Sequence, residues 1–114
     1  RKFVSSLMLA VLLLASTLTQ AARLNDIRVW NAPDYTRIVL DLDATPKFKQ
    51  FWVANPSRYV VDLPGFSLGA VKNIEAAKTG PYLKRIRVGT PKKNVSRVVL
   101  ELAQEVKVKY QVLP

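Results

Sequence analysis

The chain has 114 residues, with 18 Lys and Arg against eight Asp and Glu, and a net charge of +10. It contains no histidine and no cysteine. This excludes disulfides, imidazole zinc sites and the His-dependent nucleophile pairs of hydrolases. A chain of this length suits one small domain, and its basic balance favours an anionic partner. We therefore expect no catalytic residues, no cofactor and no metal site in this segment.

The N-terminal segment, residues 1–22, predicts a secretory signal peptide. Arg1 and Lys2 form its basic start, residues 7–14 (LMLAVLLL) are its most apolar part, and small residues precede the expected cleavage after Ala21 or Ala22. The apolar run is short for a membrane span and lacks a charged stop-transfer flank. We expect a short helix that is removed on export to the periplasm, which leaves a domain over residues 23–114 with no membrane anchor.

Export narrows the choice of partner. Removal of Arg1 and Lys2 lowers the net charge only from +10 to +8. A periplasmic protein does not meet nucleic acid, and without a cysteine at the cleavage site it cannot be anchored as a lipoprotein. An anionic polymer of the cell envelope or a lipid surface remains as the expected partner.

After the leader, the chain alternates short β-patterned runs with Pro and Gly turn signals. One stretch differs: Val71, Ile74 and Ala77 recur at every third position, which predicts a short helical segment within 67–79 that Gly80-Pro81 would end. In the β pattern, Ile38, Leu40 and Leu42 share one face and should point inward. The expected strands are 27–30, 35–42, 47–54, 58–63, 83–89, 95–102 and 106–113.

The β pattern is internally repeated. The matching segments are 27–29 (IRV) with 86–88 (IRV), 36–42 (TRIVLDL) with 96–102 (SRVVLEL), and 47–49 (KFK) with 107–109 (KVK). The offset is 59 in the first pair and 60 afterwards, which places one inserted residue in the second turn. Matches in the same order at a nearly constant offset indicate a duplicated β unit.

The repeat predicts an all-β fold: a sandwich of two symmetry-related small sheets that hide their apolar faces against each other. We expect about four strands in each sheet. The first unit continues into the strand at 58–63, whereas the counterpart of that strand would lie beyond Pro114. The expectation is therefore that the last strand is missing from this sequence.

Basic side chains alternate with apolar ones along these strands, so we expect them to face outward together. Arg and Lys pair with carboxylates, and exposed aromatic rings stack on sugars. The alternative is that the charges only solvate a sheet face and hinder edge pairing. Asp41 and Asp43 lie among these cations and are interpreted as surface carboxylates rather than a glycosidase pair. The candidate binding residues are Arg28, Tyr35, Arg37, Lys47, Lys49, Trp52, Arg58, Arg87, Arg97 and Lys107.

Two runs carry a family resemblance: RVWNAPDYTRIVLDLD at 28–43 and KFKQFWVANPSRYVVDLPG at 47–65. Together with the blocks at 87–89 and 97–102, they resemble the AMIN domain. Members of this family precede the zinc-dependent N-acetylmuramoyl-L-alanine amidases of the bacterial envelope and also occur in type IV pilus secretins. The resemblance implies a sandwich of two symmetric sheets and binding to peptidoglycan.

Three functions follow as alternatives. The first is a non-catalytic module that holds a cell-division amidase on peptidoglycan and at the septum, with septal division proteins as further partners. The second is the same module in a pilus secretin, anchoring it to the wall. The third is an interaction domain that recruits a protein through an open sheet edge. A zinc amidase domain needs His and Glu ligands, so with no histidine it is not part of this segment.

Overall fold

A computed structural model describes residues 22–69, 71 and 79–113. Of the expected signal peptide at 1–22, residues 1–21 lie outside this part of the chain, and Ala22 begins a strand. Most of the expected helical segment at 67–79 also lies outside it, on residues 70 and 72–78, while Ser67 at its start belongs to a strand. Among the described residues, no helix is long and apolar enough to cross a membrane.

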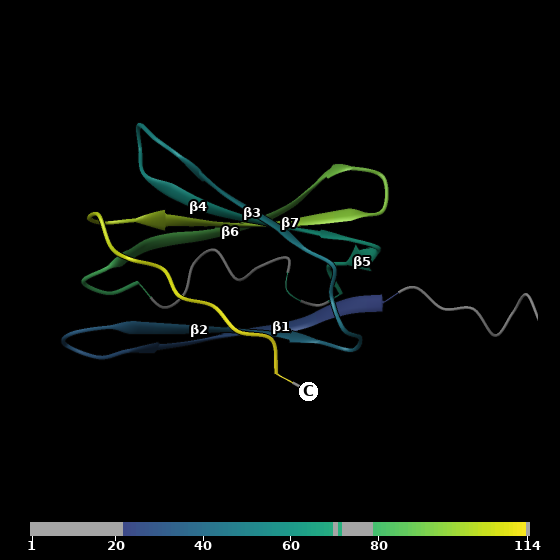
Figure 1. The fold of residues 1–114 in the computed structure, drawn as a ribbon, viewed down its shortest axis with the longest axis horizontal. Helices are drawn as coiled ribbons and strands as arrows, with labels where there is room; N and C mark the ends of the chain where they lie inside the picture. The colour runs from purple at the N-terminus through teal and green to yellow at the C-terminus, as the bar shows by residue number, and fades with distance from the viewer. Residues whose placement is uncertain (1–21, 70, 72–78, 114) are drawn as a thin grey trace, which may run out of the picture.

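The described chain forms two sheets that face each other (Figure 1). One sheet has three strands in the order β2-β1-β5, and the other has four in the order β3-β4-β7-β6. The expected all-β sandwich is confirmed. The strands are β1 (Ala22–Asn31), β2 (Thr36–Leu42), β3 (Lys49–Val53), β4 (Arg58–Pro64), β5 (Phe66–Ser67), β6 (Leu83–Lys92) and β7 (Val95–Leu102).

The duplication is visible in the hydrogen-bond register of two hairpins, β1–β2 and β6–β7. Ile27 stands opposite Leu40, and its repeat partner Ile86 stands opposite Leu100. Both hairpins also shift register at equivalent places. The shift lies between Leu24 and Asp26 in the first hairpin and between Leu83 and Arg85 in the second. A shared register with a shared bulge confirms that the two hairpins are equivalent units, because a bulge is a specific backbone feature.

The second hairpin has one additional irregularity, between Gly89 and Lys92. The offset between the repeats rises from 59 to 60 in this hairpin, so the second unit contains one additional residue. The irregularity shows that this residue lies at the end of β6, before the turn. The tip of that hairpin turns at Asn94, whose positive φ of 62° is one that Asn tolerates better than most residues. The inserted residue is therefore absorbed within β6 and leaves the pairing of β7 unchanged.

The hairpin β3–β4 joins the sheet of the other repeat. β4 pairs antiparallel with β7 along its whole length, from Arg58 opposite Glu101 to Pro64 opposite Val95. The first unit is thus divided between the two sheets, which ties the repeats together through backbone hydrogen bonds as well as through the core. A short parallel pairing of β5 with the start of β1 closes the three-stranded sheet.

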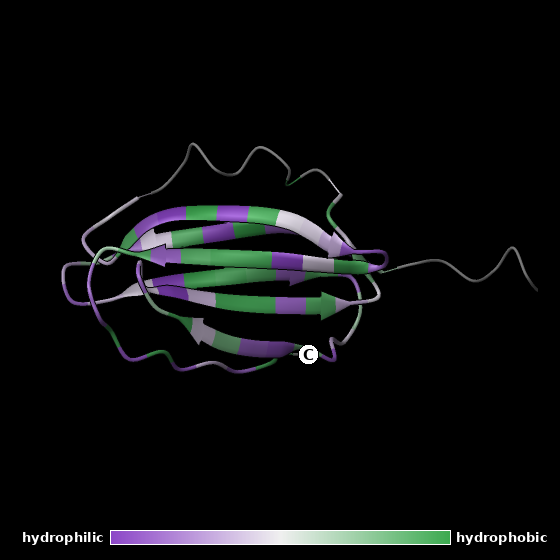
Figure 2. Ribbon diagram, turned by 90° about the horizontal axis from the view of Figure 1, so that it is seen from above, coloured by the Kyte–Doolittle hydropathy of each residue, from purple (hydrophilic) through white to green (hydrophobic). Residues whose placement is uncertain are grey.

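The core lies between the sheets and is built from equivalent side chains of the two hairpins. Leu24 and Ile27 of β1 and Leu83 and Ile86 of β6 are at most 1% exposed. The predicted inward residues of β2 also pack against this core: they are Ile38, Leu40 and Leu42. Figure 2 shows the resulting alternation of hydrophobic and hydrophilic positions along the strands.

One polar side chain is buried with the core. The Ser96 hydroxyl is fully buried and donates a hydrogen bond of 2.6 Å to the backbone carbonyl of Phe66. Nearby, the Gly65 amide donates to the Asn94 carbonyl at 2.6 Å. Gly65 has a φ of 81°, which favours glycine, so the chain can turn sharply from β4 into β5. These contacts hold β5 against the second hairpin.

The strand expected at 106–113 does not form, and that prediction is wrong. Its repeat counterpart, β3, is held by the ladder with β4, whereas no strand in the described part of the chain pairs with 106–113. The segment instead follows one side of the sandwich (Figures 1 and 2). It is attached there by side chains, with the rings of Tyr110 and Phe48 in an edge contact at 5.3 Å.

The equivalence of the hairpins predicts similar stability losses on both sides of the core. Ile27→Ala and Ile86→Ala should each lower the free energy of unfolding by about 2–5 kcal/mol, because each leaves a cavity in a site closed to water. Urea unfolding monitored by tryptophan fluorescence measures this loss. A loss below about 1 kcal/mol at either position would contradict the shared core.

Candidate carboxylate-binding faces

Most of the predicted basic residues lie on two opposite faces of the sandwich rather than on one. The strand register places Arg28 and Arg37 on the outer side of the three-stranded sheet, which we call the β1–β2 face. The outer side of the four-stranded sheet is the β6–β7 face. Its predicted site residues are Lys49, Arg58, Arg87 and Arg97.

The other four predicted residues are not at outward positions of these strand ladders. Trp52 is opposite Tyr59 and therefore on the core side of β3, where the two rings meet at 5.1 Å although half of Trp52 remains exposed. Burial and the nearby Tyr110 raise the pKa of Tyr59. Tyr35 is exposed in the turn before β2. Lys47 and Lys107 are exposed in segments outside the strands.

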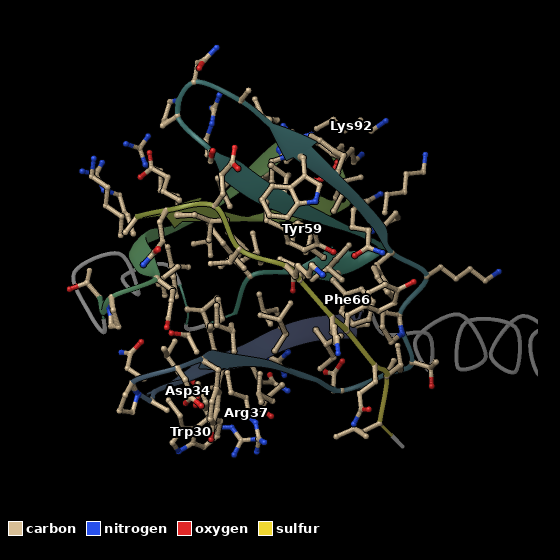
Figure 3. All side chains as sticks on the ribbon, turned by 60° about the vertical axis from the view of Figure 1, so that its left-hand side comes forward. Trp30, Asp34, Arg37, Tyr59, Phe66 and Lys92 are labelled. Atoms are coloured by element: carbon tan, nitrogen blue, oxygen red, sulfur yellow. The ribbon has the colours of Figure 1, made fainter. Side chains whose placement is uncertain are left out.

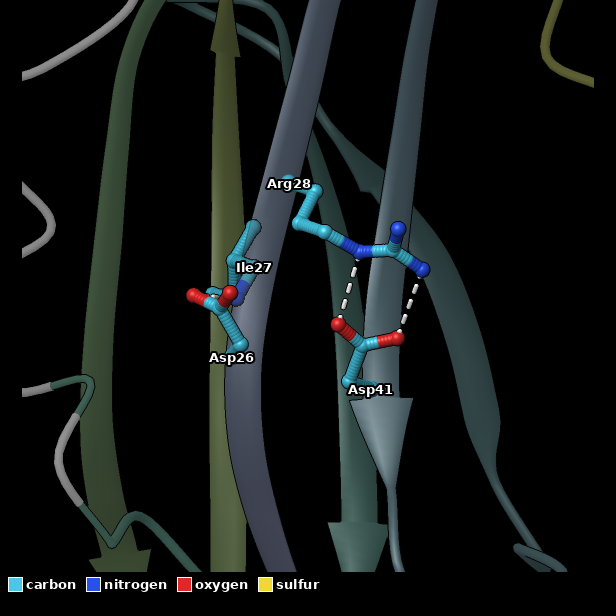
Figure 4. Close-up of polar contacts among 4 residues, drawn as sticks. All are labelled: Asp26, Ile27, Arg28 and Asp41. Atoms are coloured by element: carbon cyan, nitrogen blue, oxygen red, sulfur yellow. Dashed lines mark hydrogen bonds and ion pairs between the residues drawn. The ribbon is translucent and has the colours of Figure 1, made fainter.

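On the β1–β2 face, Arg28 forms a bidentate ion pair. Its Nε and Nη2 atoms donate hydrogen bonds of 2.7 and 2.9 Å to the two carboxylate oxygens of Asp41 (Figure 4). The same guanidinium lies 5.3 Å from the ring centre of Trp30, a cation–π distance. Arg37, opposite Trp30 in the ladder and labelled beside it in Figure 3, has no carboxylate within ion-pair distance among the described residues.

On the β6–β7 face, Arg97 is the engaged cation. It forms a bidentate pair with Asp62 of β4, at 2.7 and 2.9 Å, and lies 5.6 Å from the ring centre of Phe51. The hydrogen bonds from Arg97 lower the pKa of Asp62 and raise that of Arg97, despite the opposing effect of burial. The sequence repeat equates Arg97 with Arg37 but gave no sign of this partner, because Asp62 comes from a strand of the other unit.

Next to this pair, two arginines share one carboxylate. The Nε atoms of Arg85 and Arg87 lie 3.3 and 3.6 Å from the Oε2 atom of Glu101. That oxygen is buried and has no hydrogen bond of good geometry among the described residues. One negative charge therefore neutralises at most one of the two guanidinium groups, and this face keeps a positive surplus. Arg85 was not among the residues predicted from the sequence.

The β6–β7 face is also hollowed. An open depression of about 270 Å³ lies over the second hairpin where β6 is irregular, and we call it the Gly89 hollow. A Cβ atom placed on Gly89 would meet no other atom within 4 Å, so the depression reaches the backbone. Its lining residues are Arg87, Val88, Gly89, Thr90, Pro91, Arg97 and Val99.

A comparison with known protein families matches residues 26–113 to the AMIN domain. The chain belongs to the AMIN domain family. The match runs through both repeats, both basic faces and the segment after β7. The resemblance of the two sequence runs at 28–43 and 47–65 to the AMIN domain is thereby confirmed.

Two curated proteins are similar to this AMIN domain. One is the N-acetylmuramoyl-L-alanine amidase AmiC of Escherichia coli O6:H1, 39% identical over 84 residues, which is 71% of this chain and 20% of the relative. The other is the N-acetylmuramoyl-L-alanine amidase AmiC of Neisseria meningitidis serogroup B, 29% identical over 98 residues, which is 83% of this chain and 24% of the relative. The chain thus spans about a quarter or less of the length of these relatives.

The Arg97–Asp62 pair predicts a pH-dependent contribution to stability. The pKa of Asp62 is lowered in the folded state, so its ionised form stabilises the fold above the unfolded value of about 3.9, and this stabilisation disappears as the pH falls through the lowered pKa. Asp62→Asn should cost about 1 kcal/mol at pH 7, a modest amount because Arg97 is partly exposed, and less at pH 2, where the carboxylate is more protonated.

Urea unfolding of the wild type and Asp62→Asn at both pH values measures this difference. Asp34→Asn is the matched control, because it removes one carboxylate from an exposed turn, and Asp34 forms no ion pair with another described residue. An equal cost of Asp62→Asn at both pH values would contradict the ionic role of the pair.

Proposed function

We propose that this chain is the peptidoglycan-binding module of an exported cell-wall N-acetylmuramoyl-L-alanine amidase. In this role it holds its parent enzyme on the wall of the periplasm and at the division septum, where daughter cells separate. The observation that carries the proposal is the AMIN domain match over residues 26–113, together with two relatives that are both named as such amidases. The hydrolytic chemistry, including any zinc site, belongs to another part of the parent protein.

The surface chemistry supports a wall ligand. Peptidoglycan joins a sugar backbone to stem peptides that carry carboxylates, and arginine binds carboxylates through paired hydrogen bonds. Arginines project from both outer faces, Lys49 projects from the β6–β7 face, and the chain carries a net charge of +10. Exposed rings at Trp30 and Phe51 lie next to arginines on these faces and offer surfaces for sugar rings.

Binding to purified sacculi tests the proposal. The protein, expressed with its own N-terminal segment and recovered from the periplasm, should sediment with sacculi at physiological ionic strength. Added salt should release it progressively, because exposed charge pairs are screened over about 8–10 Å. Sacculi with amidated carboxylates are the control and should retain much less protein. A protein that stays in the supernatant at low and physiological salt would contradict wall binding.

Septal placement needs a separate test. A fluorescent fusion to the C-terminal side of this chain, exported to the periplasm of dividing cells, should concentrate at constriction sites. The matched control is an exported fluorescent protein without the domain. Uniform periplasmic fluorescence of the fusion, with sacculus binding intact, would show that the domain binds the wall but does not select the septum.

A further inference from the structure

The two equivalent hairpins differ in the chemical type of the outward residue at two positions. Where the first hairpin has Asp26 opposite Asp41, the second has Arg85 opposite Glu101. Where the first has Trp30, the second has Gly89. Since the backbone register is the same at these positions, the two hairpins differ there only in their outward side chains.

The first difference changes the charge balance. On the β1–β2 hairpin, two carboxylates accompany two arginines at the outward positions of the ladder. On the β6–β7 hairpin, Glu101 alone accompanies Arg85, Arg87 and Arg97. Asp62 from β4 neutralises Arg97, which leaves Arg85 and Arg87 to share a single carboxylate. One positive charge on this hairpin is therefore available to an anionic ligand.

The contacts of the two equivalent arginines show which cation is available. Arg28 makes two short hydrogen bonds to Asp41 and covers the Trp30 ring. Arg87 approaches Glu101 only to 3.6 Å, beyond a good hydrogen bond, and half of its side chain is exposed. Its guanidinium donors can therefore turn to a ligand without breaking a strong internal pair.

The second difference supplies the space. At the position where the first hairpin carries the Trp30 indole, the second has only the Cα of Gly89, and the hollow of about 270 Å³ opens there. The irregularity between Gly89 and Lys92 borders the hollow on one side. Val99 and Pro91 give its lining an apolar part beside the guanidinium groups of Arg87 and Arg97. Such a site suits a carboxylate on a short aliphatic stem.

We propose, building on the wall-binding function above, that the Gly89 hollow is the carboxylate site of this domain. A carboxylate of a peptidoglycan stem peptide pairs with Arg87, its aliphatic stem lies over Val99 and Pro91, and Arg97 lines the same hollow while it remains paired with Asp62. The two faces then have different roles: the β6–β7 face holds the ligand carboxylate, and the internally paired Arg28 on the other face does not.

The competing site is Arg37, which has no carboxylate within ion-pair distance among the described residues and lies opposite Trp30 on the β1–β2 face. At the described outward positions of that face, two arginines are balanced by two aspartates, so it has no surplus of cations like the one beside the Gly89 hollow. The two sites lie on opposite sides of the sandwich, so single substitutions distinguish them.

Binding of a soluble disaccharide-tetrapeptide muropeptide and of purified sacculi tests the proposal. Gly89→Trp fills the hollow with the residue that the first repeat has at the same place, and Arg87→Gln removes the cation that is held only loosely by Glu101. Each should weaken muropeptide binding about tenfold or more, the effect of losing one charge-assisted hydrogen bond. The matched control, Val39→Trp, adds the same bulk at an outward position of the β1–β2 face and should change binding less than about twofold.

The possible outcomes distinguish a failure of the Gly89 hollow as the binding site from a failure of wall binding itself. If the wild type does not bind sacculi, the proposed function itself fails. If it binds and both Gly89→Trp and Arg87→Gln bind equally well, the hollow is not the site while wall binding stands. A loss with Val39→Trp and not with the other two would assign binding to the Arg37 side. Arg87→Gln keeps the test valid should Gly89→Trp fail to fold, which urea unfolding reports.

Modified ligands test whether the carboxylate is the recognised group. The same muropeptide with its peptide carboxylates amidated, and the disaccharide without peptide, should both bind the wild type at least tenfold more weakly than the intact muropeptide. Equal binding of the amidated form would overturn the carboxylate assignment, because no charge would then remain for Arg87 to recognise.

Discussion

The structure depends on the packing of two equivalent hairpins against each other. Each contributes the same pair of core side chains, Leu24 and Ile27 from one and Leu83 and Ile86 from the other, and these are closed to water. Burial of apolar surface is the main stabilising contribution in a small domain without disulfides. Because the inner face of each hairpin is fixed by this shared core, variation between the repeats falls on the outer faces, where the proposed ligand contacts lie.

Much of the fold follows from the sequence, because a duplicated alternation of apolar and polar residues specifies strands, faces and register. The same information does not specify which strands become neighbours. The pairing of β4 with β7 joins strands from different repeats, and with it comes the Arg97–Asp62 pair. The strand expected at 106–113 is absent for the same reason: a strand needs a partner, and its pattern alone does not provide one.

The sequence predicts which residue types form the candidate site, but not how these residues are distributed over the two faces. Alternation shows that basic residues point outward, yet it cannot tell that they divide between two faces or that Trp52 lies on the core side of β3. The repeat also makes Arg28 equivalent to Arg87, although their contacts differ: one is held by Asp41 and Trp30, the other is loosely held beside Gly89. Family membership shows that the chain is an AMIN domain, and these contacts are the basis of our proposal that its β6–β7 face meets the ligand.

The central claim is that two hairpins with one backbone design have diverged so that only the second binds a carboxylate. Chemical-shift mapping of the isotope-labelled protein with the soluble muropeptide tests it most directly. The account predicts that backbone amide shifts change at Arg87, Gly89 and Arg97, while those at Arg28, Trp30 and Arg37 stay within the baseline scatter. Changes concentrated on the first hairpin, or equal on both, would contradict it.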